Sequence, residues 1–247
     1  MSGYIVKKFW HLGKYCYVFY RFLLEQVCQR QFKKPCMLLD AGCGRNVSSL
    51  SYVPNNVFVI GVDISRWNIS ESNQKAKKKG YKNFNFVVAS LKALPFRQQI
   101  FDLAVCVDVL EHIPNNQEAI DEISRVCKSR ASFIGSTSNI MNPLLMFDSF
   151  APKSMTRILT AKFAGIHYER HCRLSFNKLI RILNHSGFQV CDAKLLGFPP
   201  FQPWLYEFSD RKIPFYAYVW IVFNKLTEKK PLNLLKETVV FHAIKKG

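Results

Sequence analysis

Residues 38–46 read LLDAGCGRN, and residues 59–65 read VIGVDIS. In both stretches an apolar run ends in an acid, and the first run continues into a glycine turn. Glycines allow positive φ and close approach of the backbone to a ligand, and the Asp63 carboxylate offers two acceptor oxygens that suit a ribose diol. Asp40 and Asp63 lie 23 residues apart, which leaves room for a turn, a crossover helix and a second parallel strand. The pairing predicts a site for a nucleoside-containing cofactor across the ends of two parallel strands.

The glycine turn by itself leaves three interpretations open. It resembles the first motif of the class I S-adenosylmethionine-dependent methyltransferases, a hydrophobic strand ending in D-x-G-x-G-x-G. Asp40, Gly42 and Gly44 match, and Asn46, which tolerates left-handed geometry, stands at the third glycine. A nicotinamide dinucleotide site would place its third glycine at position 47, which is Val47. The third interpretation is an ordinary strand-to-helix turn.

Two further segments match the methyltransferase family in its order along the chain. Residues 86–96, FVVASLKALPF, resemble the third strand and its L-P-F, with Ala89 and Ser90 in place of the usual Gly-Asp. Ser90 can still accept a hydrogen bond, but it carries no charge. Residues 101–115, FDLAVCVDVLEHIPN, resemble the fourth strand and the turn after it. The order of the motifs favours the methyltransferase interpretation.

The resemblance implies S-adenosylmethionine as the cofactor and a place for each part of it. Asp63 would bind the ribose, and the turn over residues 40–46 would cradle the methionine portion. Ser90 and Leu91 would flank adenine, and residues 107–108 would border the transferred methyl group. The implied cofactor-binding residues are Asp40, Gly42, Gly44, Asn46, Asp63, Ile64, Ser90, Leu91, Val107 and Asp108.

The downstream half of the chain predicts the rest of an α/β fold. Residues 131–136 read as a strand, and residues 169–190 resemble a family segment of the form H-x-R-x-F-S followed by a helix and G-F. Ser175 is suited to cap that helix and Gly187 to end it. Further strands are expected from Phe188 and over residues 237–245. The resemblance implies a Rossmann-like, seven-stranded, mostly parallel sheet with helices on both faces and an antiparallel final strand.

Length and composition fit one domain over residues 1–247. With 49% hydrophobic residues, the chain can fill the core of one large α/β domain. It has eight cysteines and no C-x-x-C pair, which favours buried free thiols, such as Cys43 and Cys106, and a reducing compartment. The longest uninterrupted apolar run, residues 213–223, contains a proline and falls short of the about 20 residues that span a membrane. No secretory signal is evident, so we expect a cytoplasmic protein.

The formal net charge of +18 favours anionic partners, such as nucleic acid, anionic lipid or a phosphorylated small molecule. The densest basic run is KAKKKGYK, residues 75–82. Such a run is also typical of the end of a helix, where lysines complement the helix dipole and Gly80 can end the helix. The other basic residues are scattered, which indicates a diffuse field rather than a dedicated groove.

Two aromatic-rich segments predict a lid or a membrane contact. Over residues 4–30 polar side chains recur at helical spacing and leave a wide apolar arc. We therefore expect residues 1–30 to form an amphipathic helix that packs on the domain as a lid or lies in a membrane surface. Residues 198–235 fall between the last two strands, where the family often builds its substrate cover. A greasy cover favours an apolar or lipid-like acceptor, and a helix packed on the sheet is the alternative.

Candidate catalytic residues follow the fourth strand, because methyl transfer can require a base close to the methyl donor. Asp108, Glu111 and His112 are the candidates there, and His171 in the H-x-R segment is a further one. The order D-x-x-E-H resembles the E-x-x-E-H with which some quinone-precursor and small-RNA 3′-end methyltransferases hold a divalent cation. The shorter reach of Asp108 disfavours a metal, and none is predicted. A structural start of the next helix is the alternative role for L-E-H.

The sequence therefore predicts a methyltransferase that acts at oxygen or carbon of a small acceptor with an apolar body. A quinone precursor, a lipid or a lipid-linked glycan would fit, and the expected place is the cytoplasmic face of the inner membrane. The N-P-P-[YF] signature of DNA and protein-glutamine methyltransferases does not follow the fourth strand, which disfavours exocyclic amines. Two alternatives stay open. The charge favours an RNA methyltransferase, and Asn46 with Ser90 favours a binding module without catalysis.

Overall fold

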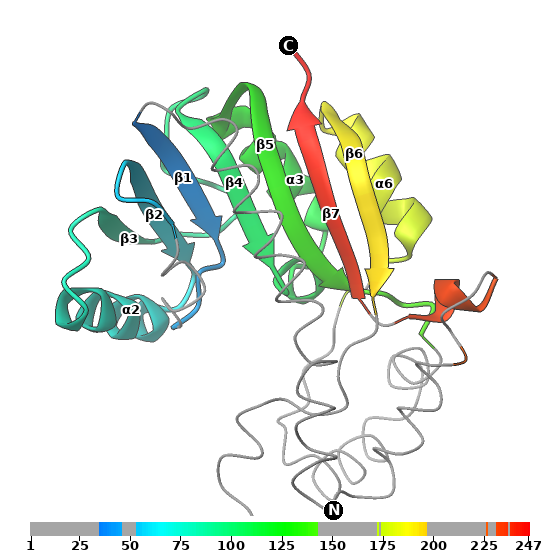
Figure 1. Ribbon diagram of the computed structural model, residues 1–247, viewed down its shortest axis with the longest axis horizontal. Coiled ribbons are helices and arrows are strands. Elements are labelled where there is room, and N and C mark those ends of the chain that lie inside the picture. The colour runs from blue at the N-terminus through cyan, green and yellow to red at the C-terminus, as the bar shows by residue number, and fades with distance from the viewer. Residues whose placement is uncertain are drawn as a thin grey trace, which may run out of the picture.

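Seven strands form one sheet in the order β3-β2-β1-β4-β5-β7-β6 (Figure 1). The structure is a computed structural model, and it describes residues 35–45, 53–142, 172, 174–196, 226, 231–236 and 238–247. The first five strands are parallel: β1 (Cys36–Ala41), β2 (Val57–Asp63), β3 (Phe84–Val88), β4 (Phe101–Val107) and β5 (Cys127–Ser138). The final strand, β7 (Thr238–Lys245), lies antiparallel between β5 and β6 (Phe188–Leu196). The predicted fold class is confirmed.

Helices lie on both faces of the sheet, as predicted. α2 (Arg66–Lys78) joins β2 to β3, and α3 (Asn116–Val126) joins β4 to β5, with the short 3-10 helix η2 (Leu110–His112) before it. The two crossings run in opposite directions along the sheet, so right-handed connections place α2 and α3 on opposite faces. α6 (Phe176–His185) shares the α3 face (Figure 1), and a second 3-10 helix, η4 (Leu232–Leu235), precedes β7.

The ends of α6 and the stop of α2 follow the sequence prediction, and α2 has a serine cap that was not predicted. The Ser65 hydroxyl accepts a hydrogen bond from the Asn68 amide, and the Ser175 hydroxyl accepts one from the Lys178 amide. Left-handed glycines follow both helices, with φ of +71° at Gly80 and +82° at Gly187. Three lysines occupy the last turn of α2, namely Lys75, Lys77 and Lys78. The interpretation of this basic run as a helix end is confirmed.

Two strand boundaries differ from the sequence expectation. β5 begins at Cys127 rather than at residue 131, because α3 passes directly into the strand and Cys127 pairs with Phe101. The polar residues that follow Cys127 do not resemble a buried strand, and they pass through a left-handed residue, Arg130, with φ of +65°. β3 begins at Phe84, two residues earlier than expected, because the edge of the sheet does not demand a wholly apolar strand.

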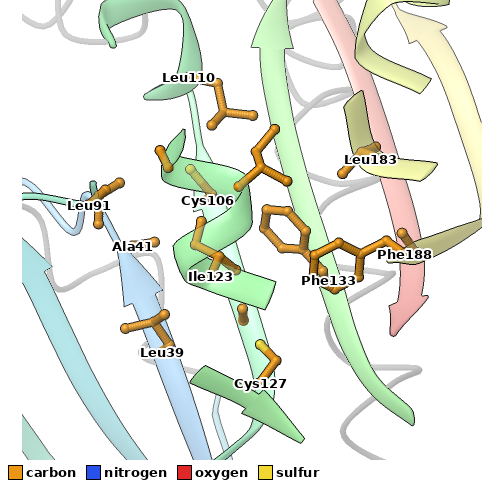
Figure 2. Close-up of a cluster of buried hydrophobic side chains, with 14 of the residues drawn as sticks. Leu39, Ala41, Leu91, Cys106, Leu110, Ile123, Cys127, Phe133, Leu183 and Phe188 are labelled. Carbon is orange, nitrogen blue, oxygen red and sulfur yellow. The ribbon is translucent and has the colours of Figure 1, made fainter. Parts of the chain in front are cut away.

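The larger core cluster fills the space between the sheet and the helices α3 and α6. Figure 2 shows side chains from β1, β4 and β5 gathered around α3, including Leu39, Cys106 and Phe133. The Phe133 ring lies 5.1 Å, centroid to centroid, from those of Phe188 and Phe241. Alternate residues of the same strands form a second cluster on the opposite face, as strand geometry requires.

The six described cysteines are free thiols. Cys36, Cys106 and Cys127 are buried and Cys43 is half-buried, in line with the expectation from their apolar surroundings. Cys172 and Cys191 are exposed, so that expectation does not extend to them. Within the described ranges, no helix is long and apolar enough to cross a membrane. Residues 1–30 and most of residues 198–235 lie outside the described residues, so the lid and the substrate cover stay predictions.

Candidate active site

The glycine turn after β1 folds back onto the end of β2. The amides of Gly42 and Cys43 both donate to the carbonyl of Val62, at 2.8 and 3.0 Å. Gly42 has φ of +80°, and a Cβ there would lie 2.5 Å from a methyl group of Val109. Residue 42 must therefore be glycine for two reasons, its left-handed backbone and its contact with the loop after β4. By contrast, among the described residues no atom lies within 4 Å of a Cβ built on Gly44, so those residues leave space on that side of the turn.

Asp63 ties this turn to the start of α2. One carboxylate oxygen accepts from the Gly44 amide at 3.0 Å, and the other accepts from the Ser65 amide at 2.8 Å and from the Asn68 side chain at 3.2 Å. A carboxylate has about four acceptor positions, so a hydroxyl donor can still bind here. The next residue, Ile64, is 77% exposed at the same strand end. An acid and an open apolar side chain thus lie together, as ribose and adenine would require.

Asp40 differs from Asp63 in the hydrogen bonds of its carboxylate. Among the described residues, none donates a hydrogen bond to its carboxylate. Part of the residue is still exposed, but the carboxyl group is surrounded by protein. This desolvation, followed by repulsion from Asp63, raises the pKa of Asp40 to about 7. A cationic ligand group beside Asp40 would favour its ionised form.

The loop after β3 is held close to β2 and α3. The Ala89 amide donates to the Asp63 carbonyl at 3.1 Å, and the Ser90 hydroxyl accepts from the Lys92 amide at 3.2 Å, beside the buried Leu91. Further along, Arg125 of α3 donates to the carbonyls of Leu94 and Phe96. The L-P-F segment is therefore fixed by α3, and the Ser90 region has a defined place at the end of β3.

The acids after β4 bind to hydroxyl groups at the end of β5. Asp108 has a left-handed backbone, with φ of +54°, and its carboxylate accepts from the Ser136 hydroxyl at 2.7 Å. Glu111 is buried and accepts from the Thr137 hydroxyl at 2.9 Å. Burial raises the pKa of both carboxyl groups, and repulsion from Asp108 adds to the rise that brings the pKa of Glu111 to about 7. Burial thus makes both of these acids weaker than exposed carboxyl groups.

The predicted site residues meet at the carboxyl ends of four adjacent strands, β3, β2, β1 and β4. This edge is where open parallel sheets bind their ligands. Asp40 lies near the end of β1 and the glycines follow it, Asp63 ends β2 and Ile64 follows, and Ser90 and Leu91 follow β3. Val107 ends β4 and Asp108 follows, with Glu111 and the exposed His112 in η2. Asn46 and His171 lie outside the described residues. Within the described ranges, no group of three or more His, Cys, Asp and Glu residues is placed to hold a metal ion.

Sequence reasoning missed the partners of these residues. Val109 restricts residue 42 to glycine, Ser136 and Thr137 bind the acids after β4, and Ser72 of α2 donates to the Gly44 carbonyl. The serines and the threonine carry no motif, because a hydroxyl group in a strand or helix is common. The only sequence signal lies in β5, where Ser136, Thr137 and Ser138 follow an apolar run. No such signal marks Ser72.

Comparison with known proteins gives one family and several partial relatives. Residues 32–190 match a family described as "Methyltransferase domain". The "Uncharacterized methyltransferase YcgJ" of Bacillus subtilis (strain 168) is 28% identical over 47% of this chain and 42% of its own length. The "Ubiquinone biosynthesis O-methyltransferase" of Coxiella burnetii (strain Dugway 5J108-111) is 29% identical over 47% of this chain and 49% of its own length. The chain thus spans about half the length of the curated relatives it matches.

Among solved structures, the chain is similar to geranyl diphosphate C-methyltransferase from Streptomyces coelicolor A3(2), a structure with Mg²⁺, geranyl diphosphate and S-adenosyl-L-homocysteine. The TM-score is 0.64 at 16% sequence identity, over 92% of this chain and 80% of that one. At this identity the likeness shows a common fold.

Proposed function

This chain belongs to the class I S-adenosylmethionine-dependent methyltransferases, and from this premise we propose that it methylates oxygen or carbon of a small, apolar or lipid-like acceptor. The observation that carries the proposal is the arrangement at the ends of β1 and β2. There a glycine turn that packs on Val109 is joined, through the Gly44 amide, to the acid at the end of the next strand.

The residues present fit S-adenosylmethionine. Gly44 leaves open space beside the turn, Asp63 keeps an acceptor position for a ribose hydroxyl, and Asp40 has no hydrogen-bond donor among the described residues. Asp40 and Asp63 also place two carboxyl groups at this edge, and a cationic cofactor would favour the ionised form of Asp40 in an otherwise basic protein. The cofactor supplies a methyl group activated by its sulfonium. The protein binds it through the turn, Asp63 and the Ser90 region, as the sequence resemblance implies.

We assign the base for the acceptor to the acids after β4. A base works best when its pKa lies near the working pH, and the raised pKa of Glu111, about 7, meets this condition. Asp108 beside it would share the proton, and the exposed His112 is the alternative base at the same strand end. The buried hydroxyl of Ser138, which has no hydrogen-bond partner among the described residues, is a further candidate contact for the acceptor. His171 stays a candidate from the sequence.

Two kinds of evidence support an apolar acceptor. The aromatic-rich residues 198–235 would cover the site with an apolar surface, as the sequence predicts. The relatives include a ubiquinone biosynthesis O-methyltransferase, and a similar fold carries geranyl diphosphate C-methylation. An anionic membrane surface that attracts the chain, with its charge of +18, would bring such acceptors to the site.

The test is transfer of labelled methyl groups from S-adenosylmethionine to a panel of acceptors. The panel holds phenolic quinone precursors, isoprenoid diphosphates, membrane lipids and RNA, with Glu111→Gln as the matched variant. We expect label in a phenolic or isoprenoid acceptor and about a hundredfold loss with Glu111→Gln. Label at one defined position of RNA would instead support the RNA methyltransferase. If the cofactor binds and no acceptor of the panel takes label, the assignment of the acceptor class fails and a binding module becomes the better account.

A further inference from the structure

One face of α2 presents three hydrogen-bond donors to the cofactor turn. Asn68, Ser72 and Lys75 lie at helical spacing i, i+4 and i+7, which places them in one row along the helix. Asn68 donates to Asp63 at 3.2 Å, Ser72 donates to the Gly44 carbonyl at 2.8 Å, and Lys75 donates to the Arg45 carbonyl at 2.8 Å. We propose that Ser72 and Lys75 are positioning residues that set the turn in its cofactor-binding shape. The cofactor in this proposal rests on the proposed function.

The turn needs such support because its own backbone is unusually free. Gly42 and Gly44 both have positive φ, and glycine has more conformational freedom than any other residue. The amides of the turn bind to β2, through the Val62 carbonyl and the Asp63 carboxylate. The carbonyls of Gly44 and Arg45 are bound from the other side, by α2. Gly44 is therefore held at both its N–H and its C=O, which fixes the orientation of the residue beside the open space.

Ser72 has the features of a residue placed for this contact. It is fully buried, between Ile69 and Ala76 on the side of α2 that packs on the sheet. An apolar side chain would be the ordinary choice at such a position. A helical serine commonly bonds to the carbonyl four residues before it, but this hydroxyl reaches across to the Gly44 carbonyl. The contact thus serves the turn rather than the helix.

Lys75 belongs to the basic run at the end of α2, but its contacts differ from those of the other lysines in that run. Its ammonium group binds the Arg45 carbonyl at 2.8 Å and lies 3.9 Å from Glu71, whereas Lys77 and Lys78 are exposed. A positive charge close to a cationic cofactor would oppose binding if charge alone mattered. The hydrogen bond to the turn is the contribution that offsets this repulsion. S-adenosylhomocysteine has a neutral sulfur in place of the sulfonium, so with this ligand the replacement of the ammonium group reports mainly on the hydrogen bond to the turn.

The experiment measures cofactor affinity by calorimetry with S-adenosylhomocysteine, in Ser72→Ala and Lys75→Met. The matched controls are Ser70→Ala and Lys77→Met, which change exposed residues of the same helix and remove the same groups. The loss of one hydrogen bond to the turn should weaken binding about three- to tenfold in each test variant. The controls should stay within about twofold of the wild type. Lys75→Arg, which keeps a donor, should recover most of the affinity lost in Lys75→Met.

Amide hydrogen exchange gives a second readout that needs no ligand. Residues 42–45 should exchange faster in Ser72→Ala and Lys75→Met than in the controls, while β5 and β7 stay as protected as in the wild type. Equal affinity and equal exchange in test and control variants would overturn the proposal. If the wild type bound no cofactor, the proposed function would fail, and the exchange rates would still decide whether α2 holds the turn. If Ser72→Ala did not fold, Lys75→Met and its arginine counterpart would decide it.

Discussion

The two parts of the sheet are held together by different interactions. The cofactor half comprises β1, β2, β3 and α2. Besides the buried apolar residues of β1 and β2, it has polar contacts around two glycines and Asp63 at the strand ends, where Ile64 and Trp67 are more than half exposed. The packed half comprises β4, β5, β6 and β7 with α3 and α6. Its centre is a group of fully buried aromatic rings, Phe133, Phe188 and Phe241. Ligand geometry should therefore depend on the first half and stability on the second.

The acids that we propose as the base join these halves. Asp108 and Glu111 follow β4 in the packed half and bind hydroxyl groups of β5, while Val109 between them packs on Gly42 of the cofactor half. A rigid scaffold thus positions the proposed base, and a turn that contacts the same loop positions the cofactor. This division can be tested with variants that should affect one property and spare the other.

The largest effect on stability is expected from Phe133→Ala. The variant removes a fully buried ring that contacts two other buried rings, so we expect the free energy of unfolding to fall by about 3–5 kcal/mol. Phe58→Ala, at a ring that is 46% exposed on β2, should cost less than about 1 kcal/mol. Urea unfolding measures both. The cofactor affinity of the folded protein should not change. A large loss of cofactor affinity in Phe133→Ala would contradict the proposed division.

Glu111→Gln should lower kcat about a hundredfold, because a general base contributes at least that much. In the wild type kcat should rise with pH through about 7, where the carboxyl group of Glu111 loses its proton, and the variant should lack this rise. Glu118→Gln, at an exposed glutamate of α3, serves as the control. A pH profile that survives in Glu111→Gln would transfer the role of the base to His112 or to another group.

Gly42→Ala tests the contact between the halves. The alanine would require an unfavourable left-handed backbone and would meet Val109, so we expect a loss of about 2 kcal/mol in stability and at least about tenfold in cofactor affinity. Gly80→Ala imposes a similar backbone cost, at φ of +71°, in open space far along α2, and should leave cofactor affinity unchanged. Adding Val109→Ala to Gly42→Ala should recover part of the loss. No recovery would mean that the backbone alone requires glycine.

Asp40→Asn should produce the smallest effect, a change in how stability depends on pH. Burial and Asp63 raise the pKa of Asp40 from 3.8 to about 7, so the folded state binds its proton more tightly than the unfolded state. Wild-type stability should consequently fall as the pH rises from about 4 to about 7, on the order of 2 kcal/mol for a partly exposed group. Asp40→Asn should flatten this fall, and Asp192→Asn on β6 should not. Identical pH profiles of Asp40→Asn and the wild type would contradict the raised pKa.

Sequence patterns predicted the elements that follow local rules. The cap at Ser175, the stops at Gly80 and Gly187 and the strand ending in Asp63 all depend on neighbouring residues, and the structure confirms them. The start of β5 at Cys127 could not be predicted, because it rests on the pairing of Cys127 with Phe101 of β4, and the polar residues that follow fall in a register shift of that pairing. Long-range contacts of this kind leave no local signal.

The site shows the same limit. The motif residues Asp40, Gly42, Gly44 and Asp63 could be read from the sequence, and they lie at the expected sheet edge. Their supporting partners could not be predicted, since Ser72 lies 28 residues from Gly44 and Ser136 lies 28 residues from Asp108. A serine does not stand out in a hydrophobic or charge pattern. Only the folded chain brings its hydroxyl group to the site.

The central claim is that the acid ending β2 holds the cofactor, and calorimetric titration with S-adenosylmethionine and S-adenosylhomocysteine tests it most directly. The wild type should bind both ligands with micromolar affinity, Asp63→Ala should lose binding, and Asp192→Ala, which removes an acid on the distant strand β6, should keep it. Circular dichroism would establish that each variant is folded. Absence of binding by the folded wild type, or equal affinity in Asp63→Ala, would contradict the account.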